Sequence, residues 1–132
     1  VNQFVHEALA KKYVVLFEAH FKRNFIHIQD VAKVFIHAIH NFEKMKNEPY
    51  NVGLSEANLS KQELCEEIKR QIPTFEFTVS EEGEDPDKRD YIVSNAKIEA
   101  TGFKPDNSLP DGIAELIKGY QVINSREGLS NV

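Results

Sequence analysis

The sequence lacks several features that define whole classes of protein. It contains one cysteine, Cys65, among 132 residues, which excludes an internal disulfide and favours a reducing compartment. No stretch approaches the roughly 18 consecutive apolar residues of a transmembrane helix, and the first residues lack the basic and apolar pattern of a signal peptide. We therefore expect a cytoplasmic protein with no membrane partner.

An excess of basic charge is also missing. The formal net charge is −5, the isoelectric point is near 5.5, and the lysines are dispersed instead of forming a stripe. This distribution excludes the electrostatic surface with which proteins bind nucleic acids. With 41% hydrophobic residues, the chain is long enough for one domain with its own core.

An initiating methionine is absent as well. The chain begins at Val1, and its only methionine is Met45. We therefore expect the chain to be processed, or to be a piece of a longer protein.

The hydrophobic pattern of the first half predicts alternating helices and strands. The opening residues have helical spacing, and short aromatic and β-branched runs predict strands over Tyr13–Phe17 and Asn24–Ile28. An amphipathic helix is predicted over residues 29–44, with Asp30 in its first turn. The predicted buried face of this helix consists of Val31, Val34, Phe35, Ala38 and Ile39.

The middle of the chain continues the alternation. Pro49–Gly53 predicts a brief strand, and Ser60 and Glu63 have the spacing of a capping box that opens a helix. Alternating residues from Thr74 predict a half-buried strand, and the polar run over residues 81–90 predicts a loop.

Two more helices are predicted near the C-terminus. The first is short and stops at Gly102, and the second opens with a cap formed by Ser108 and Asp111. Few, short strands among helices indicate an α/β or α+β fold, in which the strands either join a larger sheet as a minority or form a small mixed sheet covered by helices. We predict a single region over residues 1–124 and a frayed tail over residues 125–132.

Three blocks carry a resemblance to a known family: "RNFIHIQDVAKVFIHAI", "YNVGLSEANLSKQELCEEI" and "DPDKRDYIVSNAKIEATGFKPDNSLPDGIAELI". In this order they resemble the C-terminal part of an extended short-chain dehydrogenase/reductase, the family of NAD-dependent sugar-nucleotide epimerases and dehydratases. The resemblance spans roughly residues 1–123. It implies the C-terminal portion of a Rossmann-type enzyme, which binds the nucleoside diphosphate of a nucleotide-sugar substrate.

The family's other motifs are missing from the sequence. It has neither the G-x-x-G-x-x-G fingerprint nor the Y-x-x-x-K pair, because none of Tyr13, Tyr50, Tyr91 and Tyr120 has a lysine four residues later. We therefore expect no catalytic or cofactor-binding residue here and an inactive piece, since the family's acid/base chemistry needs that tyrosine. The resemblance implies a complete parent enzyme, an isomerase or a lyase, that is a homodimer and holds NAD(P) mainly in its N-terminal half.

The resemblance implies two arginines at the substrate. Arg23 precedes the F-I-H-I-x-D run, where the family's arginine contacts the diphosphate, and a guanidinium suits phosphate oxygens. The alternative for Arg23 is a surface pair with a nearby acid. Arg89 is the second candidate, although Glu84 stands where many relatives have their loop arginine. Arg89 either substitutes for that residue or neutralises the acidic loop.

Three polar residues are weaker substrate-binding candidates by the same resemblance. Asn58 and Ser60 correspond to a segment near the nucleotide, and Asn2 lies near a position that contacts substrate in some relatives. Ser60 also has a complete explanation as a helix cap, and Asn58 as a loop residue.

Metal binding is not predicted from the histidines or the acidic run. His37 and His40 should lie on the polar side of their helix without a third ligand, and His27 should be a structural histidine within a strand. The acidic run of residues 81–87 lacks the ligand spacing of a calcium loop. Cys65 should be a small core residue.

A second hypothesis is that the 132 residues act alone as a non-catalytic nucleotide-binding or protein-interaction module. A fragment of an enzyme should expose an apolar face where its other half belongs, and that face would favour self-association. A stand-alone module should not.

Overall fold

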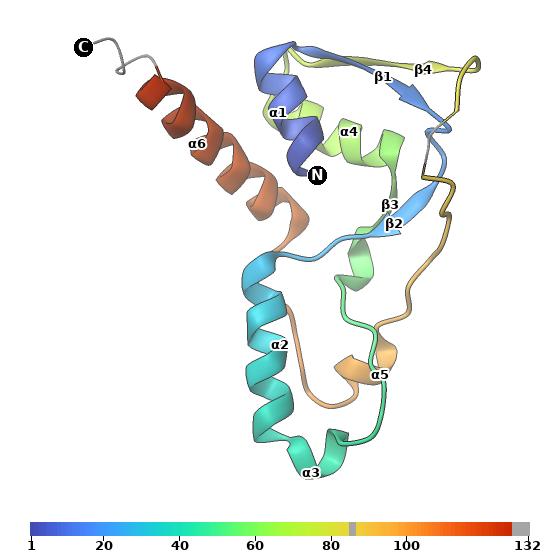
Figure 1. The fold of residues 1–132 in the computed structure, drawn as a ribbon, viewed down its shortest axis with the longest axis vertical. Helices are drawn as coiled ribbons and strands as arrows, with labels where there is room; N and C mark the ends of the chain where they lie inside the picture. The colour runs from blue at the N-terminus through green and yellow to red at the C-terminus, as the bar shows by residue number, and fades with distance from the viewer. Residues whose placement is uncertain (85–86, 128–132) are drawn as a thin grey trace.

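The fold is built on two small sheets. The computed structural model describes residues 1–84 and 87–127. β1 and β4 pair in parallel, with Tyr13 opposite Glu76, and β2 and β3 pair antiparallel, with Arg23 opposite Leu59. Figure 1 shows α1, β1, β4 and α4 at one end of the molecule and α2, α3 and α5 at the other. The elements are α1 (Asn2–Ala10), β1 (Tyr13–Phe17), β2 (Lys22–Asn24), α2 (Ile28–His40), α3 (Phe42–Met45), η1 (Ser55–Ala57), β3 (Asn58–Ser60), α4 (Lys61–Gln71), β4 (Glu76–Ser80), α5 (Ala96–Glu99) and α6 (Leu109–Glu127).

The larger hydrophobic core joins α1, α4 and α6 to the parallel sheet. Its buried members come from both ends of the sequence, from Val5 in α1 to Ile113 in α6. Cys65 is completely buried in it, so its predicted role as a small core residue is confirmed. The remaining buried members are Ala8, Leu16, Ala19, Leu64, Ile68, Ile72 and Phe75.

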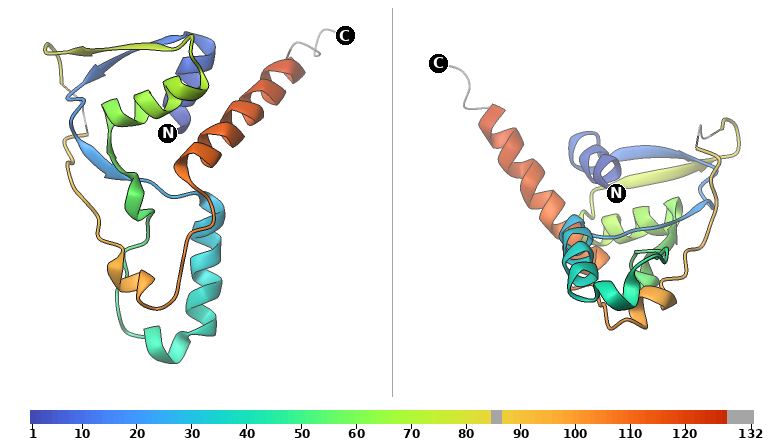
Figure 2. Two further views of the ribbon diagram at one scale, coloured as in Figure 1. Left: turned by 180° about the vertical axis from the view of Figure 1, so that it is seen from behind. Right: turned by 60° about the horizontal axis from the view of Figure 1, so that its bottom comes forward.

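A smaller second core holds the other end of the molecule. It consists of Val34, Met45, Ile98 and Phe103, which come from α2, α3, α5 and the segment before α6. Figure 2 shows α2 and α6 meeting at an angle near the middle, with α2 extending away from the two sheets. The mixed α/β fold class predicted from the sequence is confirmed.

Most predicted helices form as expected, and both predicted caps are present. Ser60 Oγ accepts a hydrogen bond from the Glu63 backbone N at 3.1 Å, and the Glu63 carboxylate accepts one from the Ser60 backbone N at 2.7 Å. Ser108 and Asp111 exchange the equivalent bonds at the start of α6. α6 continues to Glu127, so the first residues of the predicted tail are helical, and residues 128–132 lie outside the described part.

Two predicted strands are wrong. The strand expected over Asn24–Ile28 is instead β2 (Lys22–Asn24), and α2 already begins at Ile28 because His27 caps it by accepting a hydrogen bond from the Gln29 backbone N at 3.2 Å. Residues 49–53 form no strand, and the strands of the described chain pair only as β1 with β4 and β2 with β3. Short apolar runs do not reveal whether a partner strand exists.

The predicted buried face of α2 is only partly correct, because Val34 is buried and Ala38 packs against the second core but Phe35 and Ile39 are exposed. Asp30 and Val34 are its buried residues, whereas Ile28, Phe35, Ile36 and Ile39 are between 56% and 74% exposed. We call these four side chains the α2 outer stripe. The rotation of α2 is set by a polar contact, since the buried Asp30 carboxylate accepts hydrogen bonds from the segment before α6. α2 is apolar on more than one face, so hydrophobicity alone did not identify the covered one.

His37 was predicted on the exposed polar side of α2, and this is wrong as well. Its Nε2 lies 2.8 Å from Thr101 Oγ1, and its ring lies 5.6 Å from the Phe103 ring, centre to centre. The same rotation of α2 that exposes the α2 outer stripe turns His37 toward the second core. His40 is exposed, as predicted.

Candidate functional site

Arg23 lies in the middle of β2, and several contacts hold its guanidinium in one orientation. Nη1 donates to the backbone O of Lys22 at 2.8 Å, and the guanidinium carbon lies 5.3 Å from the centre of the Tyr91 ring. Nη2 donates to the backbone O of Asp87 at 3.2 Å and lies 3.1 Å from Asp87 Oδ1. A guanidinium held in this way is preorganised to bind an anion.

Arg89 contacts the same carboxylate from the other side. Its Nε donates to Asp87 Oδ1 and its Nη2 donates to Asp87 Oδ2, each at 2.7 Å. The hydrogen bonds from Arg89, together with the contacts from Arg23, hold the pKa of Asp87 well below its ordinary value, although desolvation opposes them. The two arginines predicted at the substrate therefore meet at one charged carboxylate.

Local hydrogen bonds place the loop that carries Asp87 and Arg89. The backbone N of Lys22 donates to Asp90 Oδ1 at 2.8 Å, and the backbone N of Tyr91 donates to the Lys22 backbone O at 3.4 Å. In Figure 1 this segment follows β4 and runs beside β2 and β3. A loop distant in sequence is thus aligned along the strand that carries Arg23.

A hollow of about 200 Å³ lies beside Arg23. Its polar lining includes Arg23, Asp87 and Lys61, and its apolar lining includes Phe4 of α1 and Leu64 of α4. Two of these side chains are cations, so the hollow suits the charged part of an anionic ligand. Neither Lys61 nor Asp87 was predicted from the sequence, because each belongs to an ordinary polar run.

Asn58 and Ser60 lie on β3, the strand adjacent to Arg23. The Asn58 amide is engaged by the fold, since Oδ1 accepts from the Val93 backbone N at 2.8 Å and Nδ2 donates to the Val93 backbone O at 3.1 Å. Ser60 is engaged as the cap of α4. Both residues are therefore close to the arginine in the sheet, and their contact with a nucleotide stays a prediction.

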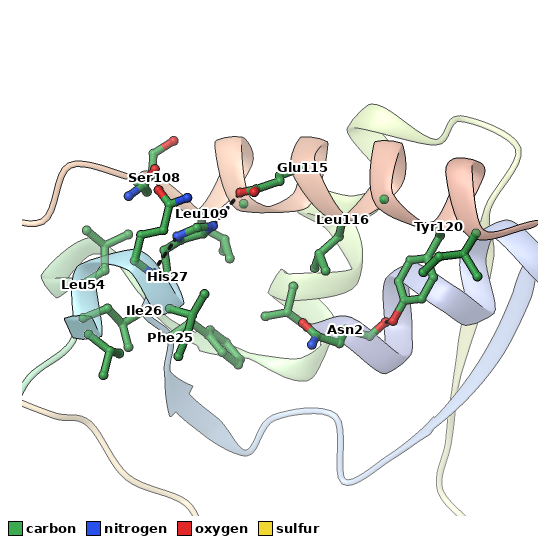
Figure 3. Close-up of a pocket in the computed structure, with 18 residues that line it drawn as sticks. Asn2, Phe25, Ile26, His27, Leu54, Ser108, Leu109, Glu115, Leu116 and Tyr120 are labelled. Atoms are coloured by element: carbon green, nitrogen blue, oxygen red, sulfur yellow. Dashed lines mark hydrogen bonds and ion pairs between the residues drawn. The ribbon is translucent and has the colours of Figure 1, made fainter. Parts of the chain in front are cut away.

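Asn2 lines a different and larger cavity (Figure 3). This groove of about 620 Å³ lies between the N-termini of α1 and α2 and one side of α6. The hydroxyl of Tyr120 donates to the Asn2 backbone O at 3.4 Å. Most of the lining is apolar, including Phe25, Leu109 and Leu116. The substrate contact predicted for Asn2 stays a prediction, and the structure places it in this groove instead of in the hollow beside Arg23.

One polar pair lies in the wall of this groove. His27 Nε2 lies 2.7 Å from Glu115 Oε2, and His27 Nδ1 accepts the hydrogen bond from the Gln29 backbone N. Figure 3 shows the pair joining the start of α2 to α6. His27 is a structural histidine as predicted, but at a helix N-terminus and not within a strand. Its partner lies 88 residues away, so no local pattern identified it.

Metal ligation finds no support in residues 1–84 and 87–127. No group of three or more histidine, cysteine, aspartate or glutamate side chains in these ranges is arranged to hold a metal ion. No helix among the same residues is both long and apolar enough to cross a membrane.

The described glycines do not form a cradle for a dinucleotide pyrophosphate. A Cβ at Gly53 would lie 1.4 Å from Asn24 Oδ1, and one at Gly83 would lie 2.7 Å from the Phe17 ring. A side chain at either position would therefore collide with a neighbouring side chain of this chain. Gly102 and Gly119 have no atom within 4 Å of such a Cβ.

Comparison with known proteins supports the predicted family. The model of the NAD dependent epimerase/dehydratase family matches residues 1–53. A GDP-6-OMe-4-keto-L-xylo-heptose reductase from Campylobacter jejuni is similar in structure, with 25% identity, a TM-score of 0.67, and coverage of 86% of this chain and 35% of that one. A GDP-mannoheptose C4 reductase from the same species, with NADP bound, has 27% identity, a TM-score of 0.65, and coverage of 84% and 33%.

The fold recurs in a more distant enzyme. L-threonine dehydrogenase from Phytophthora infestans has a TM-score of 0.73 at 13% identity, and the match covers 91% of this chain and 40% of that one. This chain thus spans between a third and two fifths of the length of these solved structures. The predicted resemblance to the NAD-dependent epimerase/dehydratase family is confirmed, since the family model matches residues 1–53 and the similar solved structures include two sugar-nucleotide reductases.

Proposed function

We propose that this chain binds the nucleoside diphosphate part of a nucleotide-sugar substrate for an NAD(P)-dependent epimerase, dehydratase or reductase. The observation that carries the proposal is the meeting of Arg23 and Arg89 at the Asp87 carboxylate. Carboxylate and phosphate oxygens are recognised by the same guanidinium donors, so this point suits a diphosphate. The names of the two Campylobacter neighbours, both of which act on GDP-linked heptoses, support this substrate class.

The two arginines have different tasks in this proposal. Arg23 is held by the Lys22 and Asp87 backbone oxygens and by Tyr91, so it provides a fixed anchor. Arg89 is exposed and provides a second, adaptable contact. Anchoring the diphosphate orients the attached sugar, and such positioning contributes substantially to the rate of a reaction. We assign NAD(P) binding and hydride transfer to the remainder of the complete enzyme.

The α2 outer stripe supports the interpretation that this chain packs against another protein surface. Ile28, Phe35, Ile36 and Ile39 form an exposed apolar row along one helix, which is costly to leave in water. This feature was expected for a part of a larger enzyme and not for the stand-alone module. We infer that the dinucleotide-binding part of the enzyme covers the stripe, and that the isolated chain self-associates through it.

Calorimetric titration of the chain with GDP tests the proposed function. We expect binding by the wild type, and a loss of about 2 kcal/mol or more in Arg23→Ala, because the contact is charge-assisted and half-buried. Arg89→Ala should lose less, because Arg89 is more exposed. Arg70→Ala is the matched control, since Arg70 lies on α4 and pairs with Glu67. Equal GDP affinity in the wild type and Arg23→Ala would refute the assignment.

A further inference from the structure

Asp87 differs from an ordinary surface acid because its carboxylate contacts two arginines. Both of its carboxylate oxygens are used, because Oδ1 contacts Arg23 and Arg89 while Oδ2 contacts Arg89. The Nε and Nη2 donors of Arg89 form a bidentate pair with this one carboxylate. The donors that would hold a phosphate are therefore occupied by an anion of the chain itself.

We propose that Asp87 is an internal competing anion that a nucleoside diphosphate must displace from between Arg23 and Arg89. The inference rests on the function proposed above and adds a residue that sets the affinity and selectivity of that site. A diphosphate offers one phosphate to each guanidinium, whereas a monophosphate offers a single group for two. Asp87 thus favours ligands that carry both phosphates, because only they replace both contacts at once.

Exposure determines which contacts give way. The side chains of Asp87 and Arg89 are 41% and 71% exposed, and ion pairs in contact with water are weak and readily exchanged. The Arg23 side chain is only 16% exposed and keeps its bonds to two backbone oxygens, which do not depend on the Asp87 carboxylate. Displacement therefore leaves the anchor in place and frees Arg89 to follow the ligand.

Two other acids of this loop, Glu84 and Asp90, have different partners. Glu84 lies 3.0 Å from Lys88 Nζ, and Asp90 accepts the hydrogen bond from the Lys22 backbone N. Lys88 also pairs with Glu18 at 3.1 Å. Removing the Asp87 charge therefore affects the two arginines in a way that removing the Glu84 charge does not. Glu84 offers a matched control in the same loop.

The test is calorimetric titration of the 132-residue chain and its Asp87→Asn variant with GDP and GMP. Asparagine keeps the size and the backbone oxygen but removes the charge. We expect GDP to bind up to about tenfold more tightly to Asp87→Asn, because the ion pairs of Asp87 with Arg23 and Arg89 no longer compete. We expect Glu84→Gln to change the GDP affinity less than about twofold. The preference for GDP over GMP should fall in Asp87→Asn.

The possible results separate this inference from the proposed function. Weaker or unchanged GDP binding in Asp87→Asn, with Arg23→Ala still impaired, overturns the competing role and leaves the diphosphate site intact. Absence of binding in the wild type and in Asp87→Asn overturns both. Binding only by Asp87→Asn supports both.

If Asp87→Asn fails to fold, a measurement on the unmodified protein still tests the proposal. The nitrogen resonance of Arg89 Nε reports its hydrogen bond to Asp87, and it should shift as GDP saturates the wild type. An Arg89 Nε resonance that stays unchanged at saturating GDP overturns the proposal.

Discussion

The Asp30 carboxylate in the first turn of α2 accepts a hydrogen bond from the backbone N–H of Asp106 at 2.8 Å. A second oxygen accepts bonds from the backbone and side-chain nitrogens of Asn107, each at 3.1 Å. Asp30 is buried, so these bonds compensate for its lost hydration. This contact joins α2 to the segment before α6, and it determines which face of α2 is covered.

Replacing Asp30 with asparagine should therefore destabilise the chain. We expect the free energy of unfolding to fall by about 2–3 kcal/mol, because buried donors lose a charged acceptor. Urea denaturation at pH 7 measures this loss. Asp106→Asn is the control, since the exposed Asp106 carboxylate pairs with Lys33 and its backbone N–H is retained. Equal losses in the two variants would contradict a special role for Asp30.

The contribution of Asp30 should depend on pH. Burial raises its pKa, but the bonds from Asp106 and Asn107 outweigh burial and lower the pKa below its ordinary value. A lowered pKa in the folded state means that the stabilisation is complete above the ordinary value and is lost as the pH falls toward the folded value. The difference between wild type and Asp30→Asn should narrow as the pH falls below about 5 toward the lowered pKa of Asp30. A constant difference would contradict this reading.

Ser60→Ala should lose the side-chain bond of the capping box at α4, in which Ser60 Oγ accepts from the Glu63 backbone N, whereas the backbone N of residue 60 can still donate to the Glu63 carboxylate. The expected cost is about 1 kcal/mol in the free energy of unfolding. Ser94→Ala, at an exposed position outside any helix, is the control and should cost less than about 0.5 kcal/mol. Ser60→Ala also tests the predicted contact between Ser60 and the nucleotide. A larger fall in GDP affinity in Ser60→Ala than in Ser94→Ala would indicate this contact.

Truncation of the α2 outer stripe should reduce self-association. Ile39 and Ile92 are both 71% exposed, so Ile39→Ser and Ile92→Ser remove similar apolar area. We expect Ile39→Ser to lower the apparent mass at high concentration and to reduce binding of a dye that reports apolar surface. Ile92→Ser, outside α2, should change neither. Sedimentation equilibrium gives the mass, and a monomeric wild type with little dye binding would contradict the proposed role of the stripe.

Cys65 should be unreactive in the folded chain. Burial raises the pKa of its thiol to about 12, so almost no thiolate is present near neutral pH. Alkylation by iodoacetamide should be slow in buffer and fast in urea, with a rate that follows global unfolding. A fast reaction of the folded protein at pH 8 would show that α4 opens locally.

Several features of the candidate site were predictable from the sequence because their causes are local. The caps at Ser60 and Ser108 depend on residues three positions apart, and the run of Tyr13–Phe17 is a strand by its composition. Arg23 and Arg89 were selected by a family resemblance. Their meeting at Asp87 was not predicted, because it depends on a loop that lies beside β2 only in three dimensions.

The amino-acid sequence by itself determined the alternation of helices and strands, the helix caps, the buried cysteine and the resemblance to the epimerase/dehydratase family. The tertiary structure alone decided which face of α2 is buried and which anion the two arginines share. It also decided that His27 caps the N-terminus of α2 and contacts Glu115. Local patterns report how a segment can fold, since they follow from neighbouring residues. The choices left to tertiary structure involve partners 76 residues apart for Asp30 and Asp106 and 64 residues apart for Arg23 and Asp87, and only the folded chain brings these groups together.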